Sequence, residues 1–268
     1  MAIRVVVAGA TGWVGSALIP AIVESDDLAL TAAVARSAAG EDVGAATGIQ
    51  PLEITLSATL EEALTVPSDV VVDYTTSHVV RRHALLALSK GRHVVIGTSG
   101  LSEEDCYEIH QAAEGEGLGV IAAGNFSITA TLLKRFTLEA AKYVADVEIL
   151  DYASAQKLDA PSGTARELAE ALAKLRQRPT SLPVAEVTGL KDTRGTAVGS
   201  VVPVQVHSVR LPSYILSCEA IFGAPDERLT IRHDAGSSAA PYVAGTLLAI
   251  RRVAQQVGLV RGLDDLIA

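Results

Sequence analysis

The chain has 268 residues, of which 49% are hydrophobic and 20% charged, a composition typical of a globular protein with one large domain or two smaller ones. Its formal net charge of −9 and aromatic content of 4% argue against nucleic acid and anionic membranes as partners. Proteins that bind these partners present basic surfaces or aromatic rings on which bases stack. An anionic ligand must therefore be bound by a local basic site.

The cysteines, histidines and apolar runs indicate the redox compartment and whether metal or membrane binding is expected. Cys106 and Cys218 form no Cys-x-x-Cys pair, so we expect free thiols in a reducing cytoplasm. The six histidines show no spacing typical of metal ligands, and we expect no metal. The first residues lack a signal-peptide layout, and no apolar run reaches the roughly 20 residues of a membrane helix.

The first half of the chain alternates short apolar runs with helical patterns. Ser102 precedes three acidic residues and is a good N-cap for the last of these helices. Strands are predicted over 3–9, 28–35, 69–75, 93–98 and 119–126, and helices over 13–24, 60–64, 78–89 and 103–116. Repeated strand–helix–strand units with apolar strands predict an α/β fold with a Rossmann-type, doubly wound parallel sheet.

The pattern changes after residue 126. A helix over 129–144 precedes strands predicted over 146–154, 200–211, 214–223 and 228–235, which is typical of an α+β domain on a mixed or antiparallel sheet. A final helix over 241–257 could return to the first domain, and residues 189–200 resemble a mobile loop. We predict a dinucleotide-binding domain of residues 1–126 plus 238–268 and a substrate-binding and oligomerisation domain of residues 127–237.

A glycine-rich loop follows the first predicted strand. Gly9 permits a tight turn, Gly12 lets a pyrophosphate approach the backbone, and Gly15 lets the next helix pack closely. The unpaired amides at the start of that helix favour negative charge. The spacing is GxxGxxG rather than GxGxxG, and the alternative is a turn without a ligand. The loop residues predicted to contact a dinucleotide are Gly9, Thr11, Gly12, Trp13 and Val14.

The end of the second predicted strand indicates which cofactor is preferred. An acidic residue there would bind the ribose hydroxyls of NAD, but this chain has Ala35-Arg36-Ser37. The absence of a carboxylate and the presence of Arg36 and Ser37 favour the 2′-phosphate of NADPH, with NADH as a weaker possibility. The alternative is that Arg36 is a solvated surface side chain.

The segment KLDAPSGTARELAEALAKL (157–175) combines a lysine with the start of an amphipathic helix. Amides of Ser162, Gly163 and Thr164 would receive an anion such as a carboxylate, and Lys157 would supply the countercharge. Thr164 and Glu167 have capping-box spacing, and Asp159 is expected to shape the turn. The alternative is an ordinary helix cap beside a surface lysine.

Two enzyme families resemble this chain, one only at its opening and the other along its whole length. The opening AGATGWVGS is similar to short-chain dehydrogenases, whose chemistry needs a tyrosine and a lysine four residues apart on one helix. Here Tyr152 and Lys157 are five apart in a strand-and-loop segment. The whole chain instead resembles the 4-hydroxy-tetrahydrodipicolinate (dihydrodipicolinate) reductases through GATGWVG (9–15), GTSG (97–100), GNFS (124–127), KLDAPSGTA (157–165), VHSVRLP (206–212) and IFGAPDERLTIRHD (221–234).

This resemblance implies a dinucleotide domain, an α+β domain whose sheet assembles a homotetramer, and lysine (diaminopimelate) biosynthesis as the context. NAD(P)H would deliver hydride to a cyclic conjugated imine with two carboxylates, and Lys157 with the Ser-Gly-Thr turn would bind and act on that substrate. The GTSG and Asn-Phe loops would lie near nicotinamide and substrate. The further residues implied are Tyr74, Thr75, Gly97, Thr98, Asn125 and Phe126 for the cofactor and Thr98 and Ser99 for the substrate.

The chain departs from the family where a proton donor is expected. The family's HHxxK histidine pair is replaced by Ala153-Ser154, and an expected arginine after His233 is missing. Three hypotheses follow: a lysine-pathway reductase that takes its proton from Lys157, Tyr152 or water; a reductase retuned to another imine or unsaturated carboxylate; or an NADPH-binding protein without turnover. Retention of Lys157 argues against the third, because a sensor of NADPH alone has no need of it.

Overall fold

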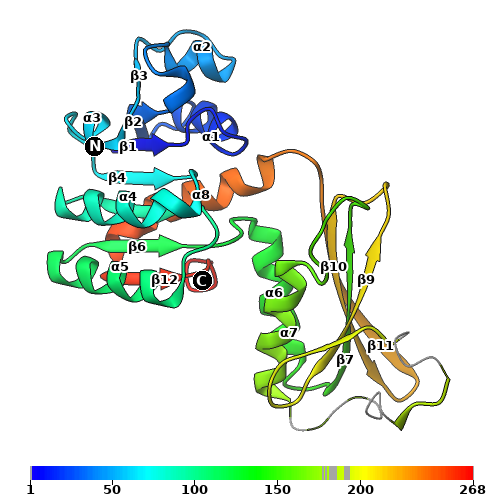
Figure 1. Ribbon diagram of the computed structural model, residues 1–268. Coiled ribbons are helices and arrows are strands. Elements are labelled where there is room, and N and C mark those ends of the chain that lie inside the picture. The colour runs from blue at the N-terminus through cyan, green and yellow to red at the C-terminus, as the bar shows by residue number, and fades with distance from the viewer. Residues whose placement is uncertain (1, 177, 179, 181–185, 190–193, 268) are drawn as a thin grey trace. The chain divides into compact units, whose positions relative to one another are not determined.

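The computed structural model describes residues 2–176, 178, 180, 186–189 and 194–267. It divides into two compact units, one of Met1–Thr131 with Ala239–Ala268 and the other of Leu132–Ser238 (Figure 1). Each unit has its own sheet and its own hydrophobic core.

The first unit contains a parallel sheet of seven strands in the order β12-β6-β5-β4-β1-β2-β3. The strand order reverses between β1 and β4. The carboxyl ends of these two strands therefore form the topological switch point, where nucleotides bind in such folds. The predicted doubly wound sheet is therefore confirmed. The strands are β1 Ile3–Ala8, β2 Leu28–Val34, β3 Leu56–Ser57, β4 Val70–Asp73, β5 His93–Ile96, β6 Gly119–Ala122 and β12 Gly258–Arg261.

Helices cover both faces of this sheet, which explains why its strands are mostly apolar rather than alternating. Val5 and Val7 of β1 pack into the core beneath α1, α2 and α8, whereas Val6 and Ala8 pack into the core beneath α3, α4 and α5. The helices are α1 Gly15–Val23, α2 Val43–Thr47, α3 Leu60–Ala63, α4 Ser77–Ser89, α5 Glu103–Glu116 and α8 Ala240–Arg252, with short 3₁₀ turns η1 at Arg36–Ala38 and η4 at Val253–Gln255.

The second unit is built on a mixed sheet with the strand order β11-β10-β7-β9-β8. The pair β7–β9 is parallel and the other pairs are antiparallel. Helix α7 packs its apolar side on one face of this sheet, so β7 alternates between buried and half-exposed residues. Helix α6 Ile128–Ala140 begins in the first unit and continues into the second. The other elements are β7 Asp146–Ala153, α7 Gly163–Leu175, β8 Thr196–Val198, β9 Val204–Arg210, β10 Leu216–Ala224 and β11 Glu227–Ala235.

Several local predictions need correction. Thr196–Val198, inside the predicted mobile loop, form strand β8, while residues 190–193 of that loop lie outside the described residues. The predicted helix 241–257 ends at Arg252, and the chain then adds strand β12 to the first sheet. That return of the C-terminal segment to the first unit was expected, and Ala249 and Ile250 of α8 lie in its core. The predicted N-cap Ser102 is confirmed with a full capping box to Asp105.

Within the described part of the chain, no helix combines the length and the apolar character that a membrane crossing requires.

Candidate cofactor and substrate sites

The glycine loop is a close contact between β1 and the start of α1. Gly9 has a φ of +83°, and a β-carbon there would collide with the carbonyl of Tyr74. A β-carbon on Gly15 would collide with the carbonyl of Gly9, so only glycine permits this approach of helix to strand. Gly12 is different, because a β-carbon there would lie 3.1 Å from the Gly9 carbonyl oxygen and meet nothing else closer than 3.9 Å.

The start of α1 offers unpaired backbone donors. Val14 is the N-cap, and no side chain among the described residues caps it. The amide of Gly12 donates to the Gly9 carbonyl, whereas those of Thr11, Trp13 and Val14 donate to no carbonyl that the structure describes. Donors of this kind at a helix start bind the phosphates of nucleotides in many proteins.

A pocket of about 540 Å³ opens beside this loop within the first unit. Gly9 and Thr11 line one part of it, and its other lining residues include Arg36, Ser37, Thr75 and a second cation, Arg82. The pocket thus joins the glycine loop to the ends of β2 and β4. Arg36 and Ser37 lie where a ribose 2′-substituent would be expected from the strand order.

A buried polar network that the sequence analysis missed lies at the ends of β4 and β5. The Asp73 carboxylate is fully buried; it is 2.8 Å from His83 Nδ1 and accepts hydrogen bonds from the hydroxyls of Thr75 (2.7 Å) and Thr98 (2.9 Å). The network ties helix α4 to the loops after both strands. A signal was present, since Asp73 is the one acidic residue that ends an otherwise apolar strand, VVVD.

Two other predicted cofactor residues, Gly97 and Phe126, lie against the Tyr74 ring. Its hydroxyl is 2.6 Å from that of Thr246, and burial raises the pKa of Tyr74 far above its usual value. Phe126 packs edge-on against this ring, and a β-carbon on Gly97 would collide with it. Asn125 accepts a hydrogen bond from the amide of Ser127 (2.8 Å). Exposed Trp13 packs against Tyr242, and Ser99 is an exposed residue of the loop after β5.

The lysine loop (residues 157–162) lies before α7 in the second unit. The Lys157 ammonium is 2.8 Å from the Asp159 carboxylate, and this contact lowers the pKa of Asp159. Ser162 is the N-cap of α7 and accepts from the Ala165 amide, so the predicted cap at Thr164 is wrong. Because the helix begins two residues earlier than that cap implies, Gly163 and Thr164 occupy its first turn. Their amides have no acceptor among the described residues.

Tyr152 and Ala153 are neighbours in strand β7, so their side chains point to opposite faces of the second sheet. Ala153, at the position of the family's first histidine, is fully buried on the α7-facing side together with Asp151. Tyr152 projects from the opposite face and donates to Glu219 at 3.2 Å, with Arg232 over its ring. Burial and the Glu219 charge raise the pKa of Tyr152. Tyr152 is therefore not grouped with Lys157, and its predicted role as a proton source is not supported.

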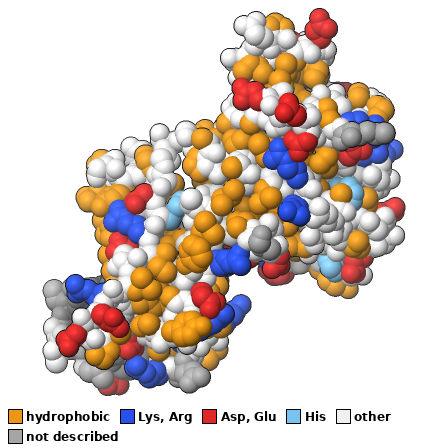
Figure 2. All heavy atoms as spheres, turned by 180° about the vertical axis from the view of Figure 1, so that it is seen from behind, with side chains coloured by type: hydrophobic (Ala, Val, Ile, Leu, Met, Phe, Trp, Pro, Cys, Tyr) orange, Lys and Arg blue, Asp and Glu red, His pale blue; other side chains and the backbone are white. Residues whose placement is uncertain are grey.

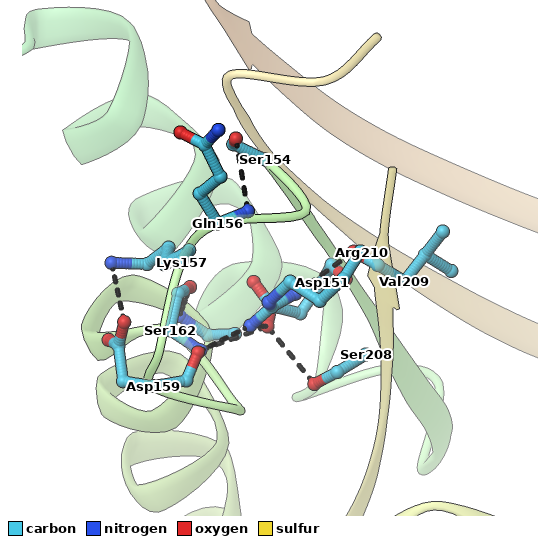
Figure 3. A network of polar contacts seen from close by, with 10 residues as sticks. Asp151, Ser154, Gln156, Lys157, Asp159, Ser162, Ser208, Val209 and Arg210 are labelled. Carbon is cyan, nitrogen blue, oxygen red and sulfur yellow. Dashed lines mark hydrogen bonds and ion pairs between the residues drawn. The ribbon is translucent and has the colours of Figure 1, made fainter. Parts of the chain in front are cut away.

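Asp151 and Arg210 contact the lysine loop, and Ser208 donates to Asp151; all three were also missed (Figure 3). The sequence offered a signal, because VHSVRLP contains both Ser208 and Arg210. Their partner Asp151 is 57 and 59 residues away in sequence, so only the pairing of β7 with β9 brings them together.

The surface has no single dominant charge on the face drawn in Figure 2, where acidic and basic side chains are interspersed. His207 is 2.8 Å from Glu148 on the outer face of the second sheet, and His233 is buried. Within the described ranges, no three His, Cys, Asp or Glu side chains are grouped as metal ligands. Both cysteines are buried free thiols, and burial raises the pKa of Cys218 to about 12.

Comparison with known proteins identifies the family. The model for the N-terminal part of dihydrodipicolinate reductase matches residues 3–126, and the model for its C-terminal part matches residues 129–267. The 4-hydroxy-tetrahydrodipicolinate reductase of Synechococcus elongatus is 41% identical over 274 residues, covering 99% of this chain and 98% of the relative. The same-named protein of Moorella thermoacetica is 38% identical over 266 residues, with 99% and 98% coverage.

A solved structure agrees along the whole chain. The dipicolinate-bound dihydrodipicolinate reductase from Paenisporosarcina sp. TG-14 superposes with a TM-score of 0.86 at 33% identity and covers 99% of each chain. Both the mixed sheet of the second unit and the parallel sheet of the first are therefore shared with a protein of this family.

The glycine loop predicts different outcomes for two matched substitutions. Gly15→Ala should destabilise the protein, because the colliding Gly9 carbonyl is backbone and cannot move aside cheaply. Gly12→Ala should keep the free energy of unfolding within about 1 kcal/mol of wild type, yet weaken NADPH binding at least about tenfold by blocking the pyrophosphate. Urea unfolding and a fluorescence titration with NADPH measure the two quantities. If Gly12→Ala binds NADPH as wild type does, the loop is only a turn.

Proposed function

The chain belongs to the dihydrodipicolinate reductase family, and we propose that it uses NADPH to reduce a cyclic imine that carries carboxylates, as in lysine (diaminopimelate) biosynthesis. The observation that carries the proposal is the pairing of two features in one chain. One is a dinucleotide-type glycine loop, and the other is a lysine loop that leads into a helix start with free amides.

The first unit fits a reduced nicotinamide dinucleotide. The glycine loop leaves room at Gly12 for a pyrophosphate, and its amides would donate to the phosphates. We propose that Arg36 and Ser37, which line the 540 Å³ pocket, hold the 2′-phosphate and so favour NADPH over NADH. Tyr74, Gly97, Thr98, Asn125 and Phe126 are proposed to border the cofactor. When bound, the nicotinamide would supply the hydride.

The second unit fits a carboxylate. We propose that the Lys157 ammonium and the amides of Gly163 and Thr164 bind it. Ser162 has a supporting part, because its amide already donates to Asp151 at 2.9 Å and its hydroxyl caps α7. A substrate carboxylate would compete with Asp159 for Lys157, exchanging one ion pair for another.

The proton must come from a group other than a histidine on β7. Ala153 is fully buried, and alanine has no proton to transfer. With Tyr152 on the opposite face of the strand, Lys157 and water are the remaining sources that we propose. The replacement of the family's histidine pair by Ala153 and Ser154 also favours a second candidate function. This is the reduction of a different imine or unsaturated carboxylate.

We propose that the protein is a homotetramer, as the family resemblance implies. The face of the second sheet away from α7 carries half-exposed apolar residues such as Leu150, Val209 and Ile221, with no described element of its own unit over them. Light scattering should give about four times the chain mass of 27.8 kDa. A monomer mass would contradict this.

The cofactor preference predicts a selective loss on removal of one cation. Arg36→Ala should weaken NADPH binding by about 1.5–3 kcal/mol, the usual range for a hydrogen bond to a charged group, and leave NADH binding nearly unchanged. Arg82→Ala is the matched control, because Arg82 lines the same pocket. Calorimetric titration of both cofactors into the three proteins measures this. Equal NADPH and NADH affinities in wild type, or a selective loss only in Arg82→Ala, would rule out the role of Arg36.

The absence of a histidine at position 153 predicts a distinctive pH profile. The turnover number on 4-hydroxy-tetrahydrodipicolinate should show no titration near pH 6–7, where an imidazole changes charge. It should also be about 10²–10⁴-fold lower than in a relative with the histidine pair, since a positioned general acid contributes about that factor. Initial rates of NADPH oxidation between pH 5 and 9 test both points. A step near pH 6.5 would contradict the proposal by implicating another imidazole.

A further inference from the structure

Asp151 is a fully buried carboxylate in the middle of a polar network (Figure 3). Its Oδ2 atom accepts from the Ser162 amide at 2.9 Å, from the Ser208 hydroxyl at 3.1 Å and from Arg210 Nη2 at 2.8 Å. Burial alone would raise the pKa of Asp151, but hydrogen bonds from Ser162 and Arg210 outweigh it and hold the pKa below its usual range. The group is therefore a carboxylate at neutral pH.

Arg210 extends this network to the middle of the lysine loop. The same Nη2 atom that meets Asp151 also donates to the backbone carbonyl of Asp159 at 2.8 Å. Arg210 lies directly across from Ala153 in the pairing of β9 with β7, and its side chain is 17% exposed. The loop is thus attached to the sheet at two points, at Asp159 through Arg210 and at Ser162 through Asp151.

These two attachments fix both halves of the proposed carboxylate site. The Asp159 attachment holds the residue whose side chain pairs with Lys157, and so sets where the ammonium lies. The Ser162 attachment sets where α7 begins, and so where the Gly163 and Thr164 amides point. The Asp151–Arg210 ion pair joins β7 to β9, and it is costly to break because either buried charge would be left without its partner.

We propose that Asp151 and Arg210 are positioning residues for the substrate carboxylate, holding Lys157 and the first amides of α7 in one preorganised arrangement. The inference rests on the proposed function and deepens it. Preorganisation raises affinity because the cost of ordering the loop is met on folding rather than on binding. The pair therefore acts on the binding of the carboxylate and not on the cofactor, whose proposed residues are in the other unit.

The test is a titration with dipicolinate, a rigid aromatic dicarboxylate, alongside a titration with NADPH. Asp151→Asn keeps the shape of the side chain but removes its charge, and Arg210→Ala removes both attachments of the arginine. Each should raise the Kd for dipicolinate by about tenfold or more, the equivalent of about 1.4 kcal/mol, while the Kd for NADPH stays within about twofold. In turnover, KM for the substrate should rise more than the turnover number falls.

Two further variants separate positioning from general support of the fold. Arg210→Lys keeps a positive charge beside Asp151 but loses the fork that reaches Asp159, so it should rescue thermal stability more fully than dipicolinate affinity. Ser208→Ala removes a donor to the same Asp151 oxygen without touching the lysine loop, so its effect on the dipicolinate Kd should be the smallest. This comparison remains decisive even if Arg210→Ala fails to fold.

The outcomes distinguish this inference from the proposed function. If wild type reduces the substrate and binds dipicolinate, but Asp151→Asn and Arg210→Lys bind it equally well, the pair is only structural and the inference is wrong. If Ser208→Ala loses as much affinity as Arg210→Lys, contact with the lysine loop is not what matters, and the inference is again wrong. If wild type neither turns over the substrate nor binds dipicolinate, the proposed function fails, and the inference with it.

Discussion

The first unit depends on how closely helix α1 approaches the end of strand β1. A side chain at Gly15 would meet the Gly9 carbonyl, and one at Gly9 would meet the Tyr74 carbonyl, so two glycines set the packing of helix, strand and neighbouring loop. This contact brings the free amides of α1 to the edge where β1, β2 and β4 end. The pocket with Arg36 and the Asp73 network lie along the same edge. The constraint is steric, and the chemistry follows from it.

In the second unit, an ion pair rather than a steric contact holds the proposed binding loop in place. An acidic protein that binds carboxylates needs a local cation and backbone donors held in place. Here a buried Asp151–Arg210 pair attaches the lysine loop to the sheet, and α7 begins where that attachment ends. The apolar core beneath α7 contributes most of the burial, while the ion pair determines the position of the loop. The proposed cofactor and carboxylate sites thus share one principle, a helix start with free amides together with a local basic side chain.

Local and periodic features of this fold could be predicted from the sequence. Mostly apolar strands, the glycine loop and the Ser102 cap are properties of short segments, and all are present. Contacts between distant segments could not be predicted, such as Asp151 with Arg210, 59 residues apart, or Asp73 with Thr98. Strand alternation would have separated Tyr152 from Ala153, while Ser162 and Thr164 were equally good caps by composition. The domain limits and the roles of individual site residues stay predictions.

The central claim is that this chain reduces a carboxylate-bearing cyclic imine with NADPH. The most direct measurement is kcat/KM for freshly generated 4-hydroxy-tetrahydrodipicolinate, followed by NADPH oxidation, beside a cyclic imine of the same ring size without carboxylates. The account predicts turnover of the dicarboxylate, a preference for it of at least about tenfold, and loss of that preference in Lys157→Ala. Equal rates on both imines, or a preference unchanged in Lys157→Ala, would contradict it.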